Sequence, residues 1–189
     1  MSVIYKILLT LCSLLLTMTV YLVKENVFIL NFIGHYIDDS ELKIALLNIP
    51  KYVSCIVYFA FAILLTLLSL HLSRFLSEDR VHVGSIVNVE AANDAFLPSY
   101  LGYFFVALSV SSTVTFIYVF SMIFIFIYFS KISYFNPIFL LLGYKFFYLT
   151  DTSGLKVVVI TKKELKIPKE VYFDSLKRIN NYTFITMEK

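Results

Sequence analysis

The residues that could bind a metal ion gather between positions 71 and 94, where two histidines stand among acidic side chains. His71, Glu78, Asp79, His82 and Glu90 are all of types that ligate metals. Their spacing matches no zinc motif, and the two cysteines, at positions 12 and 55, lie in apolar runs and cannot join them. We therefore expect no metal site.

Motifs for covalent or phosphate chemistry are also missing from the sequence. There is no G-x-S-x-G, no H-E-x-x-H and no P-loop, and the five glycines stand apart from one another. We predict that the chain is not an enzyme, and we expect no cofactor.

The remaining candidate chemistry is electrostatic recognition by the C-terminal tail. Residues 131–189 carry ten basic and five acidic side chains, with tyrosine and phenylalanine between them. This excess is modest for direct nucleic-acid binding, and the enrichment of Lys and Arg on the cytoplasmic side of membrane proteins produces the same charge. We predict that Lys162, Lys163 and Lys166 bind a protein partner, with nucleic acid contacted only indirectly through that partner.

Composition indicates that these residues belong to a membrane protein. Of the 189 residues, 59% are hydrophobic and 15% are charged, whereas soluble domains contain about 45–50% apolar and about 25% charged residues. Mean hydropathy is +0.82. The bilayer therefore accounts for most of the chain, and a separate catalytic domain does not fit in the rest.

Two apolar runs are predicted to be membrane spans, at about residues 4–23 and 52–73. The first is free of charge from position 7 to 23, and the second lies between Lys51 and Arg74. The first could instead be a secretory signal, but no small-residue cleavage site follows it, which favours an uncleaved span.

A third apolar run, residues 95–130, contains no charged side chain, and its 36 residues would extend about 54 Å as one helix. The hydrocarbon core of a bilayer is about 30 Å thick. Hydroxyl residues cluster at 109–115, where a turn would give two spans, 95–111 and 114–131. The alternative is one tilted helix whose hydroxyls bond to its own backbone. We favour two spans.

The predicted fold class is an α-helical polytopic membrane protein with four transmembrane helices and a small β-rich C-terminal cytoplasmic module. Residues 1–131 would form the bundle, with an outer loop at 24–51 and an inner loop at 74–94. Residues 132–189 would form an interfacial segment and the module. Lys6, Arg74, Arg80 and Lys131 then flank one face, which places both termini in the cytoplasm.

Shorter elements are predicted inside these loops and in the tail. Residues 144–150 and 155–161 are aromatic or β-branched on either side of a turn at 151–154, which is typical of a hairpin. Residues 182–186 are expected to form a final strand, and 173–178 one or two helical turns. A strand or hairpin is expected around Gly84, and a short surface helix at 41–48.

Two segments resemble a known family. They are NDAFLPSYLGYFFVALSV at residues 93–110 and YFNPIFLLLGYKFFYLTDTSGLKVVVITKK at residues 134–163. Both are similar to KwaA, the membrane subunit of the bacterial Kiwa antiphage system. The resemblance implies an oligomer in the bacterial inner membrane that detects infection and works with a soluble cytoplasmic partner, KwaB, which binds DNA. It implies no individual functional residue.

We therefore expect a membrane-embedded sensor and scaffold, part of an antiphage defence complex, that recruits a soluble cytoplasmic DNA-binding effector similar to KwaB. Its other expected partners are membrane lipids and further copies of itself. Two alternatives remain open: an oligomeric channel or transporter subunit, and a passive membrane anchor. The hydroxyl side chains in the apolar runs, such as Ser13, Thr17 and Thr66, are the residues a channel would have to use.

Overall fold

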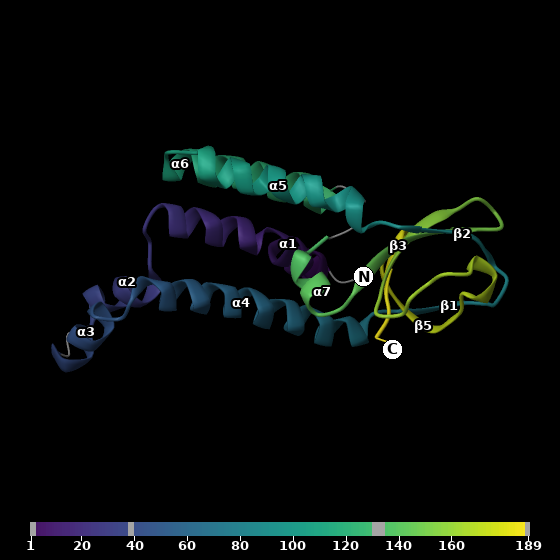
Figure 1. Ribbon diagram of the computed structural model, residues 1–189, viewed down its shortest axis with the longest axis horizontal. Helices are drawn as coiled ribbons and strands as arrows, with labels where there is room; N and C mark the ends of the chain where they lie inside the picture. The colour runs from purple at the N-terminus through teal and green to yellow at the C-terminus, as the bar shows by residue number, and fades with distance from the viewer. Residues whose placement is uncertain (1–2, 38–39, 130–134, 188–189) are drawn as a thin grey trace.

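The computed structural model describes residues 3–37, 40–129 and 135–187, and it has two parts that meet end to end (Figure 1). Long helices form one part, and a curled six-stranded sheet forms the other. The helices α1 and α4 both have one end at the sheet and extend away from it. The molecule is therefore elongated.

Two antiparallel helices, α1 (Val3–Lys24) and α4 (Lys51–Leu72), pack against each other (Figure 1). Small and hydroxyl side chains are buried on these helices, as in close helix pairs in membranes: Thr10, Ser13, Thr17, Ser54, Ala62, Thr66 and Ser69. At the end far from the sheet, α2 (Ile29–Tyr36) and α3 (Ser40–Leu47) connect the two long helices. Helix α3 confirms the short helix predicted at 41–48.

A second pair of helices, α5 (Asn93–Ser109) and α6 (Thr113–Phe129), packs along α1. The chain leaves helical structure at residues 110–112. The uncharged run is therefore divided in two near the predicted position, and the alternative of one long helix is excluded.

Hydrogen bonds and a ring contact hold the turn between α5 and α6 against the last turn of α1. The Lys24 ammonium donates to the Val110 carbonyl, and the Tyr21 hydroxyl donates to Thr113 Oγ1 at 3.1 Å. The ring of Tyr21 also stacks on the ring of Phe116, with centroids 3.7 Å apart. Lys24 thus binds one of the carbonyls that a helix end leaves without a partner.

The prediction of a polytopic fold with four membrane-crossing helices is wrong. Among the described residues, two helices are long and apolar enough to cross a membrane, Val3–Lys24 and Lys51–Phe75. The helices α5 and α6 have 17 residues each, which gives about 25 Å and falls short of the roughly 30 Å hydrocarbon core.

The sheet has the strand order β1-β5-β6-β4-β3-β2. Among the strands of the described residues, β4 and β6 are parallel neighbours and the other pairs are antiparallel. The strands are β1 (Glu78–Val81), β2 (Ile86–Ala91), β3 (Lys145–Asp151), β4 (Lys156–Thr161), β5 (Phe173–Asn180) and β6 (Thr183–Ile185). Three short helices complete the fold: η1 (Ser73–Phe75), α7 (Pro137–Leu141) and η2 (Pro168–Glu170).

Within the sheet, the β3–β4 hairpin and the final strand β6 were predicted correctly. The helical turns expected at 173–178 are wrong, because this segment forms β5. The β-rich part is also not confined to a C-terminal module, since β1 and β2 come from the predicted inner loop. The predicted domain boundary between residues 131 and 132, and Lys131 with it, lie outside the described residues.

A strand or hairpin was predicted around Gly84, and the segment forms two strands that do not pair with each other. Strand β1 pairs with β5, and β2 pairs with β3, so the two strands lie at opposite edges of the sheet. The loop at 82–85 connects these edges, and Gly84 adopts a φ of 80° there, a conformation that glycine adopts without strain. The sheet curls because its two edges are joined by so short a loop.

A hydrophobic cluster fills the junction between the helices and the sheet. Leu9 of α1, Leu70 of α4, Phe139 of α7 and Phe146 of β3 belong to it, and each is at most 6% exposed. Asn136 adds polar contacts beside the cluster: its Nδ2 donates to Thr66 Oγ1 at 2.9 Å, and its Oδ1 accepts from the Ile138 amide. The helices and the sheet therefore share one core.

Candidate partner-docking surface

The three lysines predicted to bind a partner lie together in the structure. Lys162, Lys163 and Lys166 follow β4 in the chain. They line a cavity of about 590 Å³ that Glu170 of η2 also lines. Glu164, Glu170 and Tyr172 line the same cavity. We call this set of residues, 162–172, the docking surface.

Aromatic rings position two of the lysines. The Lys162 ammonium lies 4.7 Å from the ring centroid of Tyr144, and the Lys163 ammonium lies 4.8 Å from that of Tyr172. A cation over an aromatic face is stabilised by the ring quadrupole, by about 0.5–1 kcal/mol at exposed sites. Burial raises the pKa of Tyr144 above its ordinary value. Nothing local in the sequence indicates these long-range pairs.

Lys166 has a different environment, because its closest charged neighbour is an acid. Its ammonium lies 3.5 Å from Glu164, which also accepts from Lys145 at 2.6 Å. The hydrogen bond from Lys145 is the main reason that the pKa of Glu164 lies below its ordinary value, and the charges of Lys145 and Lys166 add to it. These ion pairs are exposed, and such pairs contribute little to folding stability. Their charges remain accessible to a partner.

Apolar side chains stand beside these charges. Ile167 is 52% exposed and Tyr172 is 50% exposed. Protein interfaces commonly have this composition, in which a few aromatic or aliphatic anchors bind at the centre and polar groups surround them. The three lysines were predicted from the sequence, whereas Ile167 and Tyr172 were not.

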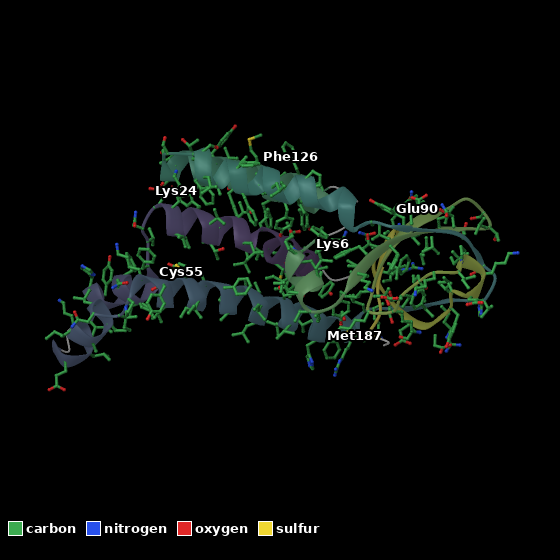
Figure 2. All side chains as sticks on the ribbon, in the orientation of Figure 1. Lys6, Lys24, Cys55, Glu90, Phe126 and Met187 are labelled. Carbon is green, nitrogen blue, oxygen red and sulfur yellow. The ribbon has the colours of Figure 1, made fainter. Side chains whose placement is uncertain are left out.

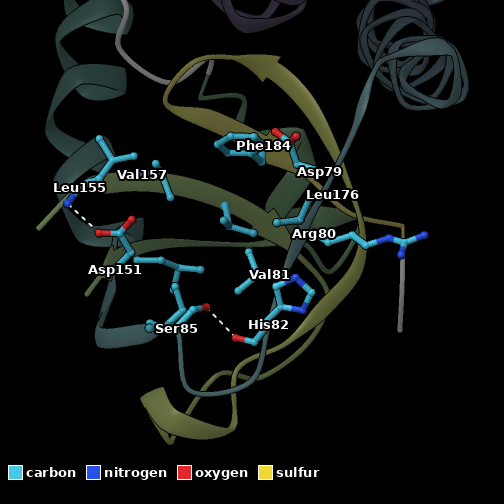
Figure 3. Close-up of a pocket in the computed structure, with 13 residues that line it drawn as sticks. Asp79, Arg80, Val81, His82, Ser85, Asp151, Leu155, Val157, Leu176 and Phe184 are labelled. Atoms are coloured by element: carbon cyan, nitrogen blue, oxygen red, sulfur yellow. Dashed lines mark hydrogen bonds between the residues drawn. The ribbon is translucent and has the colours of Figure 1, made fainter. Parts of the chain in front are cut away.

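A second cavity, of about 300 Å³, lies in the sheet between the edge strands β1 and β2 (Figure 3). Asp79, His82 and Asp151 line it together with apolar core residues. The Asp151 carboxylate stabilises its own turn, where it accepts hydrogen bonds from the amides of Ser153 and Leu155 at 2.8 and 2.9 Å. No group of three His, Cys, Asp or Glu side chains within the described part of the chain could hold a metal ion.

Comparison with known proteins identifies the family. A family model described as anti-phage protein KwaA matches residues 5–185. No curated protein and no solved structure matches the chain. The match extends over both the helices and the sheet, and it includes the two segments whose sequences resemble this family. The chain therefore belongs to the KwaA family of anti-phage proteins.

Proposed function

We propose that α1 and α4 anchor this anti-phage protein in the bacterial inner membrane. The two candidate spans have 22 and 25 residues, and only 39% and 33% of their most apolar windows are buried. A core helix of a soluble protein would be covered on most sides. The uncovered side chains of α4 include Ile56, Phe61 and Leu64, each more than half exposed, as a lipid-facing surface requires.

In this proposal the sheet lies in the cytoplasm. Lys6 stands at the end of α1 nearest the sheet, and Lys24 stands at the far end (Figure 2). Arg74 and Arg80 follow α4 on the sheet side, whereas on the far side Lys24 pairs with Glu25 at 3.1 Å. Lys and Arg are enriched on the cytoplasmic side of membrane proteins, and the sheet side carries the larger share of them here, because the far side holds only Lys24, Lys43 and Lys51. Because α1 starts and α4 ends on the sheet side, both termini would be cytoplasmic.

We propose that the docking surface recruits a soluble cytoplasmic effector similar to KwaB, so that the chain acts as a membrane sensor and scaffold. The observation that carries this proposal is the combination of three lysines with half-exposed Ile167 and Tyr172 around one cavity. A partner with acidic groups around an apolar pocket would complement it. We propose no catalytic activity and no cofactor, and contact with nucleic acid only through the effector.

Reversing the charge of all three lysines tests the docking proposal. The triple variant Lys162→Glu, Lys163→Glu, Lys166→Glu should weaken binding of a purified KwaB-like partner by roughly 10- to 100-fold, because each exposed charge contributes up to about 1 kcal/mol. Binding would be measured by titration in detergent or nanodiscs. Ile167→Ser, which leaves every charge in place, should weaken binding as well.

The matched control is Arg80→Glu, a charge reversal on β1 that lines the separate cavity between the edge strands. It should leave partner binding within about twofold of the wild type, in line with the small effects of isolated surface changes. If the triple variant bound as tightly as Arg80→Glu, the partner would have to dock elsewhere.

The buried hydroxyls support a scaffold over a channel formed by one chain. A permeation path needs polar groups that face a cavity. Thr10, Thr66 and Ser69 are buried instead, and each donates to a carbonyl of its own helix at 2.7–2.9 Å. These three hydroxyls are therefore bound to their own helices and do not face a path for solutes.

We also propose that the chain forms homo-oligomers through α6. Ile117, Tyr118, Phe126 and Phe129 are each more than half exposed on this helix, and among the described elements α6 packs mainly against α1. Aromatic and β-branched side chains of this kind suit packing between sister subunits. The expected result is a mass of several subunits for the protein in lipid nanodiscs; a monomeric mass at micromolar concentration would contradict it.

A further inference from the structure

A polar cavity of about 400 Å³ lies beside Lys6, where α1 meets the sheet. Ser77, Arg178, Asn180 and Asn181 line it as well. The Arg178 guanidinium is engaged by Asp79, with Nη2 and Oδ2 2.6 Å apart. Lys6 is only partly exposed, and none of the ion pairs found among the described residues involves it. Lys6 therefore adds a positive charge to the lining of this cavity that no described ion pair neutralises.

An apolar cavity of similar size, about 400 Å³, lies next to the polar one. Ile4 and Leu8, one turn apart on α1, form one wall, and Leu72 and Phe75 form the other. Ser77 lines both cavities. Ile4 is 78% exposed and Phe75 is 81% exposed, so this apolar cavity opens to the surroundings of the helices.

We propose that the two cavities together bind one anionic phospholipid, with its phosphate at Lys6 and Ser77 and an acyl chain between α1 and α4. The inference rests on the proposed membrane anchoring, which puts this junction at the boundary of the inner leaflet. Inner-leaflet anionic lipids are attracted to basic groups by about 1 kcal/mol per Lys or Arg. A partly buried lysine next to an open apolar cleft matches both halves of such a lipid.

The test compares lipids of the same acyl chains on the purified full-length protein, by native mass spectrometry with added lipid. Phosphatidylglycerol should bind about fivefold more tightly than phosphatidylcholine, which carries no net charge. Lys6→Glu should abolish this preference, and Lys6→Arg should keep it. Arg80→Glu, at a residue that lines neither cavity, is the matched control and should bind like the wild type.

A second arm separates a lipid from a soluble phosphate. Inorganic phosphate at the same concentrations should leave the thermal midpoint of the wild type unchanged, while phosphatidylglycerol should raise it. Phe75→Ser should reduce lipid binding without changing the response to phosphate, because it removes apolar wall only. If phosphate alone reproduced the stabilisation, the site would bind a soluble anion and the lipid proposal would be overturned.

Equal binding of the two lipids to the wild type, or an unchanged preference in Lys6→Glu, would overturn the site. Fractionation of cells with alkaline carbonate distinguishes this failure from that of the anchor. Wild-type protein that stays in the washed membranes but shows no lipid preference refutes the lipid site alone. Wild-type protein that is washed off refutes membrane anchoring, and the lipid site with it.

Discussion

Truncating Phe146 to alanine is expected to lower the free energy of unfolding by about 3–5 kcal/mol, the usual cost of removing a buried aromatic ring. Phe146 is fully buried, and its ring centroid lies 4.8 Å from that of Phe135 and 6.1 Å from that of Phe139. These rings belong to the cluster that joins the helices to the sheet, so a cavity would open where neighbouring elements cannot all close in. Reversible denaturation of the full chain in detergent, followed by circular dichroism, measures the change.

The control for this experiment is Val87→Ala. Val87 lies on β2 and is 61% exposed, so that its truncation should change the free energy of unfolding by less than about 0.5 kcal/mol. A loss for Phe146→Ala no greater than for Val87→Ala would mean that the junction cluster does not hold the two parts together.

The same cluster gives the anchor a packed connection to the docking surface. Leu9 of α1 and Tyr144 belong to it, and the ring of Tyr144 lies 5.8 Å from that of Phe139 on one side and 4.7 Å from the Lys162 ammonium on the other. Close-packed interiors resist compression and transmit displacement. A shift of α1 relative to the sheet would therefore move the ring that positions Lys162. We propose that the sensor role works through this displacement.

The elements that could be predicted from sequence are those whose partners are close in the chain. The β3–β4 hairpin needs only the turn after Asp151, where Gly154 adopts a φ of 83°. The two strands beside this turn pair residue by residue, with Lys145 opposite Thr161 at the far end. The turn between α5 and α6 was predicted for a similar reason, since a charge-free run of that length has to fold back or exceed the bilayer.

The elements that could not be predicted depend on distant partners. Strand β5 pairs with β1, with Lys177 opposite Glu78, and nothing local in that segment distinguishes a strand from a helical turn. The span count failed for another reason: it assumed that every apolar helix is long enough to cross. In the docking surface the charges were visible in the sequence, but Tyr144, which positions Lys162, is brought there by the sheet.

Placing lysine at two uncovered positions of α4 is expected to have the largest effect of all. Phe61 and Leu64 lie near the middle of the helix and are 55% and 64% exposed. If α4 crosses a bilayer, the double variant Phe61→Lys, Leu64→Lys should cost about 5–7 kcal/mol of insertion free energy, because each lysine at a helix centre costs about 2.5–3.5 kcal/mol. The protein should then leave the carbonate-washed membrane fraction.

The same substitutions would have the opposite consequence in a soluble protein, which makes the experiment decisive. An exposed leucine that faces water can be replaced by lysine with little change in stability. The matched control, Val87→Lys with Leu155→Lys, changes two exposed apolar residues of the sheet, 61% and 47% exposed, and should leave the protein in the membrane. If the α4 variant stayed folded and fractionated like this control, α4 would face water, and the anchoring role proposed for it would have to be abandoned.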